Sequence, residues 1–211
     1  FLGGARAFGA HARWSSRDRG LRLDFNQPYV FTPKLSFDME GQRWYTFTPA
    51  YDSIVTGAKL SLTHRQTART SWTFSTTSER NLSTIGAEFL GDPDLYNDLI
   101  ALGLDPTTGK QEGTLSAFGL DVQHSTTDNV LNATRGYQVA LHVEEAGRLL
   151  PGTFNYYSAS ADVRAYLPLG QSLVVANRVQ FGSIRAAGDD PAQVPFSKKY
   201  FLGGATSLRG W

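Results

Sequence analysis

Few side chains in this sequence have the types and the spacing that catalysis or metal binding requires. The chain contains no cysteine, which excludes disulfides and thiolate metal sites, and its four histidines lack the spacing of metal ligands. Asp38 and Glu40 could suggest the carboxylate pair of a glycosidase, but they lie two residues apart on one predicted strand, with no second strand to support that geometry. We therefore predict that the chain is not an enzyme and carries no metal or cofactor.

The segment FLGGATSLRGW, residues 201–211, contains a candidate for binding rather than catalysis. The guanidinium of Arg209 is always charged and offers a planar fork that suits a carboxylate. Gly203, Gly204 and Gly210 allow the backbone to turn tightly and to approach another surface closely. Taken alone, Arg209 could equally be a solvated arginine in a surface loop, so its meaning depends on the fold.

Length and charge exclude further classes of protein. The 211 residues suffice for one large or two small domains, and 20 Lys and Arg residues nearly balance 19 Asp and Glu residues, giving a net charge of +1. This balance does not predict a nucleic-acid surface, and no run of apolar residues is long enough to predict a transmembrane helix. Residues 1–4, FLGG, do not resemble a natural N-terminus, so we expect a piece of a longer chain.

Apolar and polar residues alternate along most of the chain. Between residues 157 and 167 every odd position is apolar, whereas Asp162 and Arg164 occupy the other face. A period of two indicates β-strands, whose successive side chains point to opposite faces. Most of the predicted strands exceed the ~5–6 residues usual in globular proteins and suit the ~9–11 that cross a bilayer. The pattern predicts nine strands, at residues 5–15, 20–31, 35–47, 53–65, 69–80, 114–126, 135–147, 154–168 and 171–186.

These strands fit the wall of a membrane barrel. Their polar faces carry charges of both signs, which suits a wet lumen, and their apolar faces are mostly unbroken at mid-strand, where an outward Arg or Lys costs about 2–4 kcal/mol. Short turns alternate with longer connections, except at residues 126–134. The longest connection, residues 81–113, is expected to be extracellular and to hold a short helix near residues 95–102. We predict an all-β fold, a transmembrane antiparallel β-barrel, with a soluble two-sheet sandwich as the alternative.

Aromatic residues gather at the ends of the predicted strands. Rings with a polar tip favour the membrane–water boundary, so we interpret them as the aromatic girdle of a barrel, with ordinary packing at the sheet ends as the alternative. They are Trp14, Tyr29, Phe31, Trp44, Tyr45, Phe47, Phe154, Tyr156 and Tyr166.

Four segments resemble the outer-membrane insertase superfamily, the BamA- and TamA-like bacterial surface antigen family that also includes the two-partner secretion pores. STTDNVLNATRGYQVALHVEEAG resembles the family's strand–turn–strand with D-x-x-x-x-P-T-R-G, with alanine in place of the usual proline. ADVRAYLPLGQSLVVANRVQFGSI and RGLRLDFNQPYVFTPKLSFDMEG resemble two further hairpins. FLGGATSLRGW resembles the family's signature loop, through Gly203, Gly204, Leu208, Arg209 and Gly210.

The resemblance implies that residues 1–211 are part of a 16-stranded barrel domain. An odd number of strands cannot close a bacterial barrel by itself, so further strands are expected outside this chain. In the family's order the nine predicted strands would be the third to the eleventh. The last strands and the periplasmic POTRA domains would be absent, and residues 187–211 would fold into the lumen as the signature loop.

In this family the signature arginine points into the lumen and pairs with an acid on the barrel wall. The family's acid lies on a later strand than those present here, and Asp121, Glu144 and Asp162 are candidates within this chain. Asp162, Arg164 and Arg178 are expected to form a charge network in the lumen.

The resemblance implies a factor that folds β-barrel proteins and inserts them into the bacterial outer membrane. Three alternatives stay open: a pore that secretes a partner protein, a barrel fused to a lipase-like enzyme, and a plain diffusion porin. The expected partners are outer-membrane lipids, unfolded outer-membrane or secreted proteins, periplasmic chaperones and accessory lipoproteins, but no nucleic acid.

Overall fold

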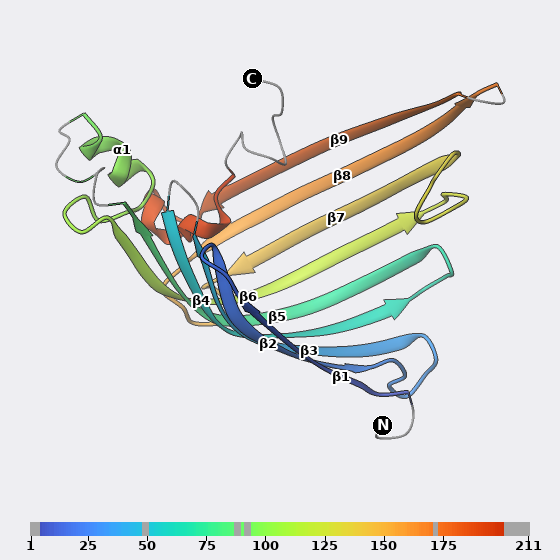
Figure 1. Cartoon of the computed structure of the whole chain (residues 1–211), viewed down its shortest axis with the longest axis horizontal. Coiled ribbons are helices and arrows are strands. Elements are labelled where there is room, and N and C mark those ends of the chain that lie inside the picture. Colours follow the sequence, from blue (N-terminus) through green and yellow to red (C-terminus); the bar gives the residue numbers. More distant parts are fainter. Residues whose placement is uncertain (1–4, 48–50, 87–89, 91–93, 171–172, 201–211) are drawn as a thin grey trace.

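The computed structural model describes residues 5–47, 51–86, 90, 94–170 and 173–200, and its strands form one antiparallel sheet. Each strand pairs with the next along the chain, so the order from edge to edge is β1 to β9, and the sheet curves into a trough (Figure 1). The prediction of nine antiparallel strands is confirmed. The strands are β1 (Ala7–Trp14), β2 (Asp18–Gln27), β3 (Leu35–Phe47), β4 (Tyr51–Arg65), β5 (Thr70–Ile85), β6 (Lys110–Ser125), β7 (Gly136–Ala146), β8 (Tyr156–Leu169) and β9 (Leu173–Ala186).

The register keeps the apolar residues of neighbouring strands on one face. Leu141 of β7 opposes Ala161 of β8, and the next pair, His142 and Ser160, lies on the other face. Leu21, Leu60, Leu141 and Val163 are 49%, 39%, 44% and 36% exposed, so no second layer of described residues covers the apolar face. A soluble sandwich would bury these side chains against a second sheet. The sheet is therefore part of a barrel wall, as predicted.

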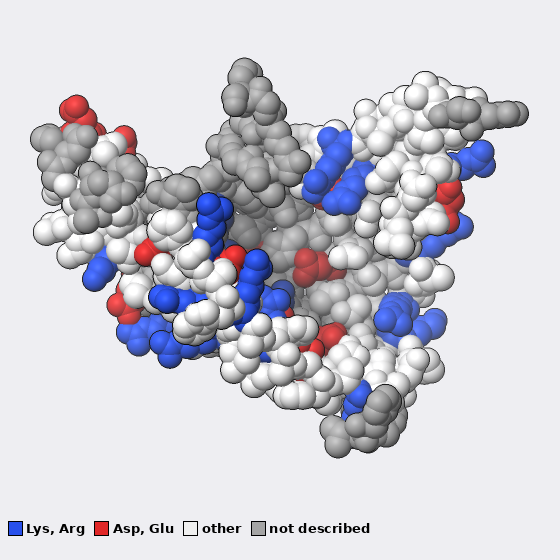
Figure 2. Space-filling model, in the orientation of Figure 1, with Lys and Arg blue, Asp and Glu red and all other residues white. Residues whose placement is uncertain are grey.

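The polar face lines the inside of the trough. In the space-filling view, acidic and basic side chains lie in the hollow between the two flanks (Figure 2). On β3 and β4, for example, Glu40 opposes Lys59, and Asp38 opposes Ser61, all on this face. The outer edges of β1 and β9 have no strand partner among the described residues, and in lipid each edge requires one.

One end of the sheet carries the larger connections (Figure 1). The helix α1 (Tyr96–Ala101) confirms the short helix expected near residues 95–102, and two short 3-10 helices, η2 (Pro191–Gln193) and η3 (Phe196–Lys198), follow β9. The bounds 81–113 expected for the long connection are wrong, because β5 continues to Ile85 and β6 begins at Lys110. Polar residues occupy both faces there, so hydropathy no longer marks the strand. No helix among the described residues is long and apolar enough to cross a membrane.

The expected aromatic girdle is correct for only part of its members. Trp14, Phe31 and Phe47 are exposed, with Phe31 in a turn at a φ of +61° because β2 ends at Gln27 rather than near residue 31. Phe154 and Tyr156, in contrast, are 1% and 0% exposed beneath the segment that follows β9. In the register, Trp44 and Tyr166 fall on the inner, polar face. Sequence position at a strand end does not distinguish these environments.

The connection between β6 and β7 is ordered around Asp128. The carboxylate accepts hydrogen bonds from the Thr134 hydroxyl at 2.5 Å, from the Thr134 amide at 2.9 Å and from the Arg135 amide at 3.1 Å. These bonds, above all the one from the Thr134 hydroxyl, hold the pKa of the Asp128 carboxyl below its usual value. Gly136 then begins β7 at a φ of +101°, which favours glycine. The D-x-x-x-x-A-T-R-G sequence therefore specifies this turn.

Candidate functional site

The inner face carries a charge network centred on Asp162. Its carboxylate accepts hydrogen bonds from Arg164 Nε, Arg178 Nε and Gln180 Nε2, each at 3.0 Å. Arg164 lies two residues further along β8, whereas Arg178 and Gln180 come from β9, where Arg178 opposes Arg164. One carboxylate between two guanidiniums offsets the repulsion that the two cations would otherwise exert on each other. The structure thus brings together the three residues of the expected lumen network.

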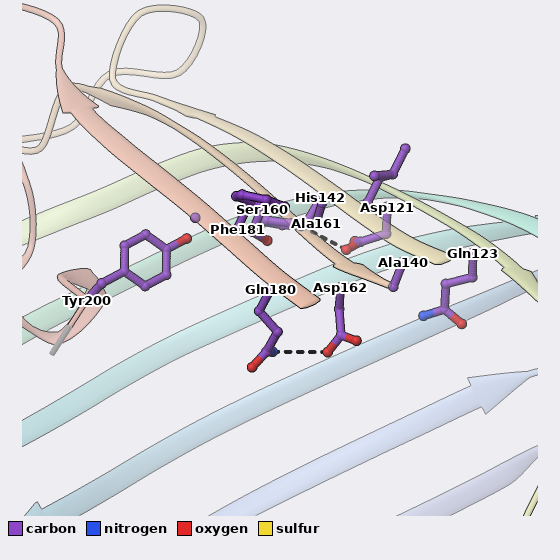
Figure 3. A pocket seen from close by; sticks show the side chains of 12 residues that line it. Asp121, Gln123, Ala140, His142, Ser160, Ala161, Asp162, Gln180, Phe181 and Tyr200 are labelled. Carbon is purple, nitrogen blue, oxygen red and sulfur yellow. Dashed lines mark hydrogen bonds and ion pairs between the residues drawn. The ribbon is translucent and has the colours of Figure 1, made fainter. Parts of the chain in front are cut away.

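A second acid, Asp121 of β6, lies opposite His142 of β7. Their Oδ1 and Nδ1 atoms are 2.7 Å apart, and the other ring nitrogen of His142 is 4.0 Å from Glu144. This part of the wall borders a cavity of about 460 Å³, and Figure 3 shows its side chains together with Tyr200, which comes from the segment after β9. Its polar lining includes Asp121, His142, Ser160, Asp162, Gln180 and Tyr200.

The third candidate acid, Glu144, is buried and paired. Its side chain is 8% exposed, accepts a hydrogen bond of 2.5 Å from the Tyr156 hydroxyl, and lies 3.2 Å from Lys198 Nζ. Lys198 belongs to residues 187–200, which connect β9 to the signature-like segment and which we name the stem. A carboxylate removed from water requires such partners, because an unpaired buried charge is costly. Glu144 therefore joins the stem to the inner wall.

The side chain of Gln111, on β6, binds backbone atoms of the stem. Its Nε2 donates to the carbonyl oxygens of Val194 at 3.0 Å and Ala192 at 3.2 Å, and its Oε1 accepts from the Phe196 amide at 2.6 Å. Gln111 is only 8% exposed, so these bonds are shielded from water. The sequence interpretation missed this residue, because it placed Gln111 in a connection rather than on an inward-facing strand position.

Apolar contacts complete the attachment of the stem. Val194 packs in a cluster with Leu115 and Tyr156 of the wall, and all three side chains are nearly inaccessible to solvent. Phe196 packs edge-on against the ring of Tyr51, with the ring centroids 4.9 Å apart. Gly182 allows the last described residue of the stem to approach, since a Cβ there would lie 2.6 Å from Cζ of Tyr200.

The stem also contacts the connection that contains α1. Lys199 Nζ donates to the carbonyl oxygen of Leu102 at 2.7 Å and to that of Pro191 at 3.3 Å, and its burial lowers its pKa. Gly103, at a φ of +75°, lies so close that a Cβ would be 2.6 Å from the oxygen of Pro191. Two connections about 90 residues apart in the sequence are thereby packed together at one end of the trough.

The two acids considered as a glycosidase pair are held by neighbouring polar side chains. Asp38 accepts a hydrogen bond from Asn26 Nδ2 at 2.6 Å, and Glu40 lies 3.4 Å from Arg22 Nε, so both acids of the supposed glycosidase pair have structural partners. The described part of the chain also contains no group of His, Asp and Glu residues arranged to hold a metal ion.

The signature-like residues Gly203, Gly204, Leu208, Arg209 and Gly210 lie outside the described residues, so the pairing of Arg209 stays a prediction. The three candidate acids differ in what already neutralises them. Glu144 faces a lysine and Asp162 faces two arginines, whereas the direct partner of Asp121 is a histidine.

Comparison with known proteins gives the family of the chain. Residues 1–211 match the model of the Omp85 superfamily domain. The fold is similar to that of BamA from Haemophilus ducreyi lacking POTRA domains 1–3, with a TM-score of 0.80 and 18% sequence identity, over 99% of this chain and 40% of that one. The chain therefore spans well under half the length of that BamA, and no curated protein matches it.

The resemblance, the fold class and the bacterial outer-membrane location expected from the sequence are confirmed by these matches. The chain belongs to the Omp85 superfamily, whose members insert proteins into the outer membrane or translocate them across it.

Proposed function

We propose that this chain forms part of the barrel of an assembly factor that folds β-barrel proteins and inserts them into the outer membrane. The observation that carries the proposal is the stem. Gln111 and Glu144 fasten it to the inner wall, and it leads directly into FLGGATSLRGW. A connection fixed to the inner wall narrows the channel, whereas a diffusion porin must keep a path open.

The proposed step is strand addition at an edge of the barrel. An extended client segment can satisfy the unpaired backbone groups of an edge strand, and alternate side chains then enter lipid or the lumen. The strands that would form this seam are not among the nine described. Unfolded outer-membrane proteins are the proposed clients, with periplasmic chaperones and accessory lipoproteins as further partners.

We also propose that this domain has no enzymatic activity. Each acid singled out as a candidate already has a cationic, imidazole or amide partner in the wall or the stem: Asn26 for Asp38, Arg22 for Glu40, His142 for Asp121, Lys198 for Glu144 and Arg178 for Asp162. These pairings favour a structural role for the five carboxylates, as acceptors that hold the wall and the stem together.

The test uses the full-length protein in phosphatidylcholine vesicles. A urea-denatured outer-membrane barrel protein is added. Its folding is followed by gel electrophoresis of unheated samples, in which a folded barrel migrates faster than the unfolded chain. We expect faster folding than in empty vesicles and a loss of the acceleration in Arg209→Ala. The control is Arg148→Ala, in the connection between β7 and β8. If the wild-type protein gives no acceleration, the proposal fails. Steady large ion conductance would then favour a porin, and export of an added partner a secretion pore.

A further inference from the structure

The end of the sheet opposite α1 gathers cations from several turns. Lys34, Arg65, Arg69 and Arg135 are all exposed there, and Figure 2 shows Lys and Arg side chains along this end. Backbone contacts place them in a row across β3 to β7: the Arg65 amide donates to the oxygen of Lys34 at 2.7 Å, and the Ser125 amide donates to that of Arg69 at 2.9 Å. We name these four residues the cationic rim.

Within the described residues, the side chains of the cationic rim form no ion pair or hydrogen bond. Asp128, an acid in the same turn as Arg135, is already engaged by Thr134 and by the Arg135 amide. At the other end of the sheet some outward cations have partners: Arg80 pairs with Glu112, and Arg148 donates to the Tyr157 hydroxyl at 3.3 Å. The cationic rim differs from these cations because no described residue neutralises any of its four side chains.

Amphipathic aromatic side chains lie just inside the cationic rim on the lipid-facing side. Trp72 is 37% exposed and donates from Nε1 to Gln66 at 2.9 Å, and Tyr137 is 46% exposed with its ring against His124. Such side chains mark the level where hydrocarbon meets headgroups. Arg69 precedes Trp72 by three residues, and Arg135 precedes Tyr137 by two. These separations correspond to about 7–10 Å along an extended chain, or about 5–8 Å along the membrane normal when the strands are tilted. Lipid headgroups occupy roughly this depth.

We propose that the cationic rim binds the phosphate groups of anionic phospholipids in the leaflet on the short-turn side of the membrane. A guanidinium binds phosphate through two parallel hydrogen bonds, and several cations spaced along a rim suit several lipid headgroups better than one compact ligand. The proposal rests on the membrane-spanning placement of the sheet and not on the client or the assembly step. Each cation near an anionic leaflet favours association about fivefold.

The experiment measures lipid association with the full-length protein in phosphatidylcholine vesicles, without any client. Spin-labelled phosphatidylglycerol and spin-labelled phosphatidylcholine report the fraction of each lipid that the protein immobilises. We expect a several-fold preference for phosphatidylglycerol that weakens with salt. The triple variant R65Q/R69Q/R135Q should lose most of this preference, and R65K/R69K/R135K should retain most of it.

The matched control is R19Q/R80Q/R148Q, which removes the same charge from the opposite end, where Arg19 stacks on Tyr45 and the other two have polar partners. An unchanged preference in this control supports a specific rim. Equal losses in both glutamine variants would overturn the proposal, because net charge alone would then explain the preference. A rim variant that loses assembly activity but keeps its lipid preference would also overturn it and indicate a protein partner.

Discussion

Replacing Gln111 with alanine is the sharpest test of how the stem is held. The substitution removes both donor bonds to the carbonyls of Val194 and Ala192 and the acceptor for the Phe196 amide. Val194 and Phe196 are 5% and 4% exposed, so their backbone groups would be left without water or partner. Each unsatisfied buried group costs about 1–3 kcal/mol. Because a small shift of the stem lets water reach part of the two groups, we expect their loss of partners to weaken the attachment of the stem by about 2–4 kcal/mol.

The loss should affect the stem and not the sheet. Gln111 keeps its backbone pairing with Ser83, and the ladder between β5 and β6 does not depend on the side chain. We therefore expect amide hydrogen exchange at Phe196 to accelerate about 30- to 1000-fold in the full-length protein, with exchange in β5 and β6 unchanged. Trypsin cleavage after Lys198 should accelerate in the same variant.

Gln123→Ala is the matched control, because Gln123 lies on the same strand and the same face and forms no side-chain hydrogen bond among the described residues. Unchanged exchange at Phe196 in Gln111→Ala would refute the reasoning. Equal acceleration in both variants would refute it too, since the stem would then respond to any loss on β6.

Lys198→Met should weaken the attachment of the stem by about 1–2 kcal/mol, measured by amide hydrogen exchange in the stem. This is less than the ~3–5 kcal/mol lost when a fully buried pair is broken, because Lys198 is 36% exposed while Glu144 is 8% exposed. Asp128 has a lowered pKa, so its stabilisation of the turn is complete above the usual value of ~3.9 and is lost only as pH falls below it. Amide protection at Thr134, corrected for intrinsic rates, should therefore stay constant between about pH 5 and 8, and Asp128→Asn should reduce it. Leu141→Arg, on the lipid face, should destabilise the barrel by about 2–4 kcal/mol in denaturant titrations in lipid.

Each of these variants has a control within the chain. Lys110→Met removes an exposed lysine from β6 without touching the stem. Asn129→Ala tests the adjacent turn position, whose side chain accepts bonds only from neighbouring amides. Ala140→Arg places the same charge on the inner face, one residue from Leu141, and should be tolerated. Equal losses in the two arginine variants would contradict the assignment of the two faces.

The sequence alone predicts the strands and their faces because both follow from a local period. Leu141 and His142 are neighbours, yet one faces lipid and the other faces Asp121, as the alternation requires. Asp162, Arg164 and Arg178 could likewise be assigned to one face before their contacts were known. Pairing consecutive strands then carries this pattern across the whole sheet, so a rule that applies to each strand predicts the wall.

The stem could not be predicted in this way. Gln111 and Phe196 are 85 residues apart, and no local pattern in either segment indicates the other. Phe154 and Tyr156 look like girdle residues because the sequence shows their position at a strand end but not the segment that covers them. Where polar residues occupy both faces, as at residues 81–85 and 110–113, hydropathy also ceases to mark the strand itself.

The two attachments of the stem depend differently on the wet lumen around them. The pair of Lys198 and Glu144 is partly open to solvent, so salt weakens it, whereas the amide bonds of Gln111 carry no net charge and are shielded. A lumen filled with ions would therefore loosen a stem held by charge alone. Because Gln111 binds backbone atoms, it also fixes the path of the chain and not merely its proximity to the wall. The path of residues 192–196, which precede FLGGATSLRGW in the sequence, is thus set by an uncharged residue.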